Sequence, residues 1–306
     1  MIWIAAAIFA STVVGLLAER RWPDRAGSGS RRSLVILLYF VLPPIVFVNL
    51  AETDFDAGLG VGLVLGVTSV AVVGAVAWLI STRLLDLDRP VAGAVICCSV
   101  TSNTGYLGYP LVLTLMGGED LSQGVAYDVV VSGIALTVFA FGVGAAFGTR
   151  AGAGFSERLR SFFLKNPLLY AAVLGALFPA SAMPDFLVEV SWVLVALVLP
   201  VGFFAVGAVI AEAQRAERLP TLPGLNSRVA TVAFSRLVVS PAALFLLAMP
   251  FTGIPRSFFL LAAMPAGLNS MIVAHAYGLD LRTTAEAVGW TTAIVVAVGL
   301  AWSVFG

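Results

Sequence analysis

The chain has 306 residues, of which 60% are hydrophobic and 11% charged, and its formal net charge is zero. Its mean hydropathy is +1.01, and a soluble domain cannot remove so much apolar surface from water. These values exclude a soluble globular protein and predict a polytopic membrane protein whose surroundings are the lipid bilayer. The net charge of zero says little about partners, and the expected ones are the lipid bilayer and a small solute rather than nucleic acid.

Apolar segments of roughly 17 to 25 residues, the length that crosses a bilayer, recur along the whole chain. A backbone in lipid must satisfy its own hydrogen bonds, and the strands of a membrane barrel would be about half as long. We therefore expect an all-α fold with ten transmembrane helices. In chain order these are Ile2–Ala18, Leu34–Ala51, Leu59–Ile80, Val91–Met116, Val125–Phe147, Pro167–Ala182, Leu187–Ala211, Val229–Met249, Phe258–Tyr277 and Thr284–Phe305.

Basic residues predict the orientation, because short cytoplasmic loops are enriched in Arg and Lys. Of the 17 basic residues, 15 lie between spans one and two, three and four, five and six, seven and eight, or nine and ten. We expect these loops in the cytoplasm and both termini outside, across the inner membrane. The first span should be retained as a helix, because its arginines follow it, whereas those of a cleaved secretory signal precede it.

The ten spans divide into two sets of five with matching features. The second span reads VLPPIVF from Val41, and the seventh, in the same place in its set, reads VLPVGFF from Val198. An odd number of spans per set makes the second set enter the membrane from the opposite side. We therefore expect residues 1–148 and 149–306 to be two inverted five-helix repeats. The connector from Gly148 to Asn166 is expected to form an amphipathic surface helix through Phe155, Leu159, Phe162 and Phe163.

The fourth span of each set is interrupted by Pro, Gly and Asn: residues 99–111 read SVTSNTGYLGYPL, and residues 264–278 read MPAGLNSMIVAHAYG. Proline and glycine leave backbone groups without intrahelical partners, which lipid tolerates only where protein or a watery cavity satisfies them. We expect the side chains of Ser102, Asn103 and Asn269 to take up these bonds. Single kinks are common in membrane helices. Two breaks at matching positions favour a transport site, where half-helix N-termini hold an anion and carbonyls hold a cation.

Ionisable residues inside the spans are candidates for charge or coupling roles. Arg236 has two alternatives, attracting an anion or pairing with a carboxylate, or snorkelling to the cytoplasmic surface. Asp128 and Glu286 are expected at the ends of their spans, exposed at the interface. His275 is the only histidine, and is either a proton carrier or a packing residue. The two adjacent cysteines, Cys97 and Cys98, offer no disulfide framework, and we expect neither a metal site nor a cofactor.

Four stretches together, SNTGYLGYPL, LPPIVF, AAMPAGLNSMIVAHAYGLD and TTAEAVGWTT, resemble the auxin efflux carrier family, whose bacterial members are relatives of the plant PIN auxin exporters. The resemblance implies that the fourth and ninth helices break and cross at the substrate site. It also implies a scaffold of spans 1, 2, 6 and 7, and a mobile transport domain of spans 3–5 and 8–10. Family substrates are organic anions, including indole-3-acetate and small carboxylates.

Asn103 and Pro110 match the family motif of the fourth helix, and Pro265 and Asn269 match that of the ninth. No proline stands beside Asn103, so the position of the first break is left open. Unlike the plant exporters, this chain has no long cytoplasmic loop, so control by loop phosphorylation is not expected.

The predicted function is secondary transport of a small organic anion by an elevator mechanism, with a homodimer expected through the scaffold helices. The alternatives are a proton- or ion-coupled carrier of another small solute, with H⁺ or Na⁺ as the coupling ion, and a channel. No GxSxG, HExxH or aspartate-rich diphosphate motif indicates an enzyme. The expected substrate-binding residues are Ser102, Asn103, Thr104, Gly105, Pro110, Met264, Pro265, Asn269 and Ser270, with His275 and Arg236 as coupling or charge candidates.

Overall fold

A computed structural model describes residues 2–150, 166–216 and 224–305, together with positions 157, 160, 163 and 164. Most of these residues are helical, and the one extended pairing within this part of the chain is an isolated antiparallel bridge between Ser102 and Ala266. The prediction of an all-α fold is confirmed for the described residues. Of the residues named for the amphipathic surface helix, Phe155, Leu159 and Phe162 lie outside the described residues.

The helices of the first half alternate between ordinary α-helix and wider π-helical turns, which are labelled η. In chain order they are α1 (Ile2–Arg21), α2 (Pro23–Ile36), η1 (Leu37–Val41), α3 (Leu42–Ala51), α4 (Ala57–Leu79), η2 (Ile80–Leu84), α5 (Arg89–Val100), η3 (Thr104–Gly108), α6 (Tyr109–Leu115), α7 (Gly118–Tyr127), η4 (Asp128–Ser132), η5 (Ala135–Ala140) and α8 (Phe141–Phe147).

The second half has the same character, with one short 3₁₀ turn, η6, and one π-helical segment, η7. Its elements are α10 (Pro167–Leu177), η6 (Ala180–Ala182), α11 (Asp185–Ala216), α12 (Ser227–Phe234), η7 (Ser235–Val239), α13 (Ser240–Ala248), α14 (Arg256–Ala262), α15 (Asn269–Tyr277) and α16 (Leu281–Phe305).

Within the described residues, five helical segments are long and apolar enough to cross a membrane by length and composition. They are Ser28–Ala51, Ala57–Leu84, Gly118–Phe147, Asp185–Ala205 and Ser227–Ala248. Two shorter apolar helices, Arg89–Val100 and Pro167–Leu177, accompany them. Several apolar helices of this length in one chain support a protein that passes the membrane more than once.

Two predicted span boundaries are wrong. The second helix begins at Pro23 rather than Leu34, because proline suits the first helical turn, and only Trp22 separates it from α1. The basic segment that was expected as a loop is therefore helical. The helix of the fifth predicted span begins at Gly118 rather than Val125. Glu119 and Asp120 stand in its first turn, where acidic side chains interact favourably with the positive end of the helix dipole.

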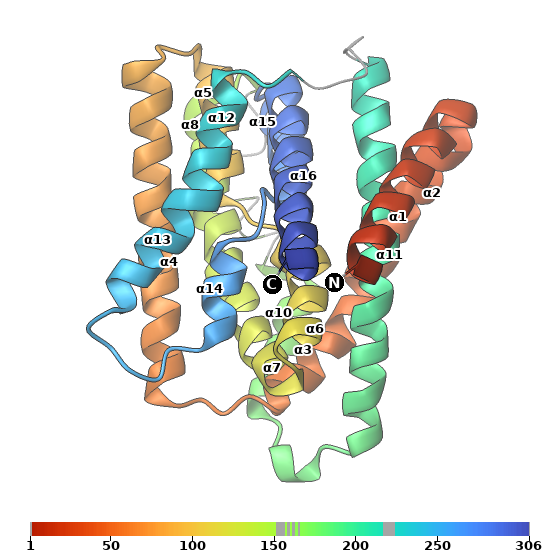
Figure 1. Cartoon of the computed structure of the whole chain (residues 1–306), viewed down its shortest axis with the longest axis vertical. Helices are drawn as coiled ribbons and strands as arrows, with labels where there is room; N and C mark the ends of the chain where they lie inside the picture. The colour runs from red at the N-terminus through yellow and green to blue at the C-terminus, as the bar shows by residue number, and fades with distance from the viewer. Residues whose placement is uncertain are drawn as a thin grey trace.

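The helices pack as two groups. The first contains α1, α2, α3, α10 and α11, in which α1 and α2 lie against the long α11, as Figure 1 shows, and α3 packs along α10. Backbones approach closely there, since a Cβ added at Gly15 would lie 2.0 Å from the Phe204 carbonyl oxygen. In the second group α4 packs on α13, α5 and α12 on α16, and α7 on α14.

Candidate functional site

The two interrupted helices cross through their extended segments. The Asn103 amide donates to the Pro265 carbonyl at 2.8 Å, and the Gly267 amide donates to the Thr101 carbonyl at 3.2 Å. A Cβ added at Gly267 would lie 2.7 Å from the Ser102 carbonyl oxygen, so only glycine fits this approach. The first break therefore lies at residues 101–103, and Pro110 stands further on, in the first turn of α6.

Arg236 satisfies the backbone on one side of this crossing. Its guanidinium donates to the carbonyls of Ala262 at 2.8 Å, Met264 at 3.0 Å and Ser99 at 3.2 Å. Ser99 lies in the last turn of α5, Ala262 is the last residue of α14, and Met264 follows α14 by two residues. The three carbonyls therefore lie at helix C-terminal ends, where the helix dipole is negative. The side chain is only 1% exposed, so the snorkelling alternative is wrong, and all three hydrogen bonds reach carbonyls rather than a carboxylate.

The side chains expected to satisfy the broken backbone do not do so. The Ala266 amide donates instead to the Thr291 hydroxyl of α16 at 3.1 Å. In the described part of the chain, the side chains of Ser102, Asn103 and Asn269 make no hydrogen bond to the freed groups. Asn103 is 3% exposed, and its side-chain oxygen has no hydrogen-bond partner among the described residues. The prediction that these three side chains replace the lost backbone hydrogen bonds is therefore wrong. The side-chain oxygen of Asn103 remains a buried acceptor at the crossing.

Asp128 lies beside the second half of the fourth helix rather than at a membrane interface. Its carboxylate accepts hydrogen bonds from the Thr104 hydroxyl and, at 2.6 Å, from the Tyr109 hydroxyl. The Thr104 and Ser132 hydroxyl oxygens are 3.0 Å apart. The expected interface position is wrong because the helix begins seven residues earlier, at Gly118, which places Asp128 about 15 Å along it. The earlier start, marked by Glu119 and Asp120, was the signal that could have found this residue.

Asp128 faces a cavity of about 420 Å³, here called the Asp128 cavity. Its size falls in the range of small-molecule sites. It lies between η4, η5, α8 and α15 on one side and η1, α3 and α10 on the other. The lining residues are Leu38, Val46, Asp128, Val129, Ser132, Gly133, Leu136, Phe141, Asn166, Leu168, Leu169, Asn269, Ile272, Val273 and Ala276. A mostly apolar wall with a few polar groups suits a small amphipathic ligand.

Three of the expected site residues lie at this cavity or next to Asp128. Asn269 lines it at the first turn of α15. Thr104 binds Asp128 directly, and a Cβ added at Gly105 would lie 3.8 Å from the Asp128 carboxylate.

The other expected residues are at the crossing or away from it. Pro265 and Ser270 are buried there, and the Ser270 hydroxyl donates to the Gly267 carbonyl at 2.7 Å. Met264 lines a second, apolar cavity of about 330 Å³ with Leu107 and Leu111. The side chain of His275 is exposed and lines neither cavity.

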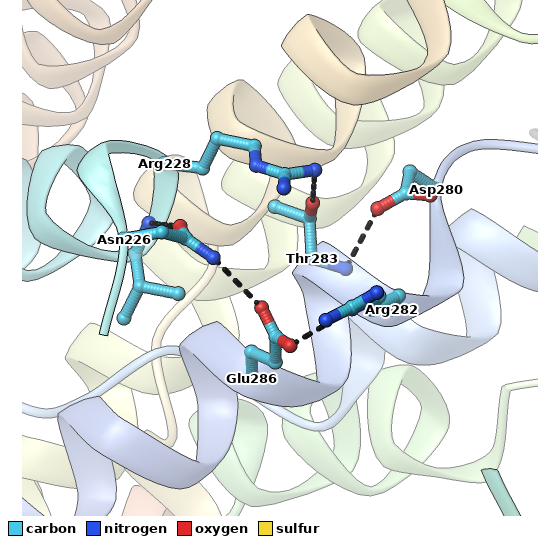
Figure 2. Close-up of polar contacts among 7 residues, drawn as sticks. Asn226, Arg228, Asp280, Arg282, Thr283 and Glu286 are labelled. Atoms are coloured by element: carbon cyan, nitrogen blue, oxygen red, sulfur yellow. Dashed lines mark hydrogen bonds and ion pairs between the residues drawn. The ribbon is translucent and has the colours of Figure 1, made fainter. Parts of the chain in front are cut away.

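Glu286 belongs to a polar cluster at the start of α16, shown in Figure 2. Its carboxylate accepts from Asn226 at 3.1 Å and pairs with Arg282 at 3.0 Å, while Arg228 donates to Thr283 at 3.3 Å. Glu286 is 3% exposed, so its expected interface exposure is wrong. The cluster ties the beginning of α12 to the beginning of α16 and lies outside both cavities.

Comparison with known proteins shows the family to which the chain belongs. Residues 5–153 and 158–303 match the model of the membrane transport protein family, that of the auxin efflux carriers, and the chain belongs to this family. An uncharacterized transporter of Methanocaldococcus jannaschii is 24% identical over 278 residues, which cover 87% of this chain and 86% of that protein. The chain is therefore a multi-pass protein of a transporter family.

Proposed function

We propose that the protein is a secondary transporter of a small organic anion, most simply a carboxylate, working by elevator-type alternating access in the inner membrane. The proposed architecture is ten transmembrane helices in two inverted repeats, 1–148 and 149–306, with both termini outside. The observation that carries this proposal is the crossing of the two broken helices beside the Asp128 cavity. Broken helices that meet near the midplane are typical of carrier sites.

The crossing is an antiparallel bridge. The Thr101 carbonyl accepts from the Gly267 amide and the Pro265 carbonyl accepts from the Asn103 amide, so each strand gives one donor and one acceptor. In the proposed inverted repeat, Ser102 and Ala266 occupy matching positions of the fourth and ninth spans.

Two features support an anionic substrate. The α15 helix begins at Asn269, so its positive N-terminal end faces the Asp128 cavity. The buried guanidinium of Arg236 adds a positive charge behind the crossing. We assign substrate contact to Thr104, Gly105 and Asn269, and assign Ser102, Asn103, Pro110, Met264, Pro265 and Ser270 to shaping the crossing that holds them.

The two cavities support alternating access. The Asp128 cavity includes Asn166, which follows the basic connector, and so lies toward the proposed cytoplasmic side. The second cavity is lined from the first, fourth and tenth spans by Ile8, Leu111 and Val295, and also from the eighth and ninth by Leu237 and Leu260. The first, fourth and tenth spans are the repeat partners of the sixth, ninth and fifth, which line the Asp128 cavity together with the second span. In an inverted repeat, such a pair would be the inward and outward access routes.

The proposal is tested with purified protein in liposomes and a panel of labelled small mono- and dicarboxylates. We expect saturable uptake and counterflow. Asn269→Ala should raise KM by roughly 5-fold to 150-fold, because a lost polar contact at a binding site costs about 1 to 3 kcal/mol.

The matched control is Asn226→Ala, which removes an asparagine side chain from the polar cluster around Glu286, away from both cavities. It should leave KM unchanged in the folded protein. An ohmic current without counterflow would mean a channel. Absence of flux for every carboxylate tested would refute the proposed function. An unchanged KM in Asn269→Ala would refute the proposed contact between Asn269 and the substrate.

A further inference from the structure

Asp128 is an acidic side chain inside the bundle whose described partners are all hydroxyl groups. Thr104 and Tyr109 donate to it, and Ser132 lies within hydrogen-bond distance of Thr104. No described basic side chain pairs with it. A charge held in a bundle without a counterion is costly, and an ionisable residue at such a place is a candidate functional group.

Among the described residues, the elements packed against Asp128 supply no basic side chain. The α4 helix has no ionisable residue. The η3 turn and α6 contribute the neutral Tyr106 and Tyr109, and the Tyr170 hydroxyl of α10 donates to the Leu164 carbonyl. Glu119 and Asp120 stand in the first turn of α7, at its far end. On α15, the exposed His275 lies outside the cavity.

Asp128 and the N-terminal end of α15 line the same cavity. An anion held at α15 is repelled by a charged Asp128, and this repulsion ends when the carboxylate carries a proton. Each ligand therefore favours the binding of the other, since coupling between two sites is reciprocal. Resting on the proposed function, we propose that Asp128 takes up one proton with each substrate anion and releases it on the opposite side, so that the protein is a proton–anion symporter.

The hydroxyl groups around Asp128 suit both protonation states. When the carboxylate is charged, it accepts from Thr104 and Tyr109. When it is neutral, it donates to Thr104, which in turn donates to Ser132, because either oxygen of that pair can be the donor. The proton comes from water in the cavity and returns to water on the other side, and no other bond changes.

The carboxylate of Asp128 and its surrounding hydroxyl groups are better suited to bind a proton than a metal ion. Hard cations take about six or more oxygen ligands directed at one point. Here the oxygen atoms of Thr104, Tyr109 and Ser132 are directed at the carboxylate or at each other through hydrogen bonds. Among the described residues, no group of three or more His, Cys, Asp or Glu side chains could hold a metal ion.

The test uses liposomes with an imposed pH gradient and a clamped membrane potential, with a monovalent carboxylate that shows counterflow. With one proton per anion, we expect about tenfold accumulation per pH unit of gradient. Asp128→Asn should retain counterflow at equal pH but lose accumulation driven by the gradient. Glu119→Gln, which removes an exposed carboxylate from the first turn of the same helical segment, Gly118–Phe147, should behave like the wild type. Protein-free liposomes correct for acid that crosses the lipid in its neutral form.

A second measurement needs no variant. A pH-sensitive dye inside wild-type liposomes should report about one proton entering per anion, above the protein-free rate. The proposal is overturned if wild-type uptake is indifferent to the pH gradient, if only a sodium gradient drives it, or if Asp128→Asn still accumulates the anion. Complete absence of counterflow in the wild type would instead refute the transport function itself.

Discussion

At the scale of single residues, Arg236 illustrates how an apolar bundle accommodates a charge. Its partners are carbonyls at the ends of two helices, which have lost their intrahelical donors at the breaks. One side chain thus satisfies the C-terminal ends of both α5 and α14. Because these ends carry a partial negative charge, the guanidinium is compensated without a carboxylate. This arrangement makes Arg236 a structural part of the crossing as well as a source of positive potential.

Replacing Arg236 should therefore destabilise the protein. In Arg236→Met, the carbonyls of Ser99 and Met264 lose a donor, while Ala262 keeps the Ser240 hydroxyl at 2.8 Å. Two orphaned carbonyls cost about 2 to 6 kcal/mol, which should lower the midpoint of unfolding in detergent. Arg228→Met removes a partly exposed arginine with a single 3.3 Å bond to Thr283 and should change the midpoint little. Equal midpoints for the two variants would contradict this role.

At the scale of the element, π-helical turns precede prolines at three places. The turns η1, η3 and η7 end at Val41, Gly108 and Val239, and a proline follows two residues later in each case, at Pro43, Pro110 and Pro241. Proline has no amide hydrogen, and its ring clashes with the carbonyl four residues earlier. A wider turn relieves that clash. Two of these turns hold Thr104 and Arg236, in keeping with the frequent occurrence of π-helical turns at functional sites.

The crossing itself requires glycine. In Gly267→Ala, the new methyl group would meet the backbone of Ser102 at 2.7 to 2.9 Å, where nothing flexible can move aside. We expect a loss of about 1 to 3 kcal/mol of stability and a reduced transport rate.

Gly289→Ala is the matched control, because a Cβ there meets nothing within 4 Å. It lies within α16 and should raise stability by up to about 1 kcal/mol through helix propensity. Thermal midpoints and liposome uptake of both variants check the prediction. A fully active and stable Gly267→Ala would exclude a crossing this close.

At the scale of the whole molecule, the first and second helix groups meet along α11, α3 and α10. There η3 and α6 contact α11, α7 contacts α3, and η4 contacts α10. The Asp128 cavity lies along the same boundary, with walls from both groups. An elevator movement would slide one group past the other and carry the crossing with it. The helices inside each group would keep their contacts.

A disulfide across this boundary should stop transport. A Cβ added at Gly202 of α11 would lie 3.2 Å from the Tyr106 Cβ, close to the roughly 3.5 to 4.5 Å typical of disulfides. The pair Tyr106→Cys and Gly202→Cys should therefore crosslink, lose uptake, and regain it on reduction.

The control pair lies within the second helix group. A Cβ added at Gly124 would lie 3.7 Å from the Ser257 Cβ, so Gly124→Cys with Ser257→Cys should crosslink between α7 and α14 without stopping uptake. Uptake is measured after crosslinking is verified by gel mobility. Full activity of the crosslinked Tyr106–Gly202 pair would refute relative movement of the groups at this contact.

The sequence by itself determined the features that arise from local chemistry. Composition gave the membrane class, and hydropathy located the apolar helices. The Pro, Gly and Asn residues indicated a break in both the fourth and the ninth span, because proline and glycine weaken the backbone hydrogen bonding of a helix, while the position of the first break was left open. Boundaries were less certain where a helix begins with polar residues, as at Pro23 and Gly118, because hydropathy detects the apolar part alone.

Only the tertiary structure decided what the polar side chains in the spans contact. Arg236, Asp128 and Glu286 were visible in the sequence as charges in or near apolar segments. Their partners nevertheless include residues 19 and 24 positions away for Asp128, and segments outside their own helix for all three. A hydropathy pattern gives neither the rotation of a helix about its axis nor its neighbours. Those depend on how side chains of distant segments pack, and this packing turned an expected interface residue, Asp128, into the acidic group of the cavity.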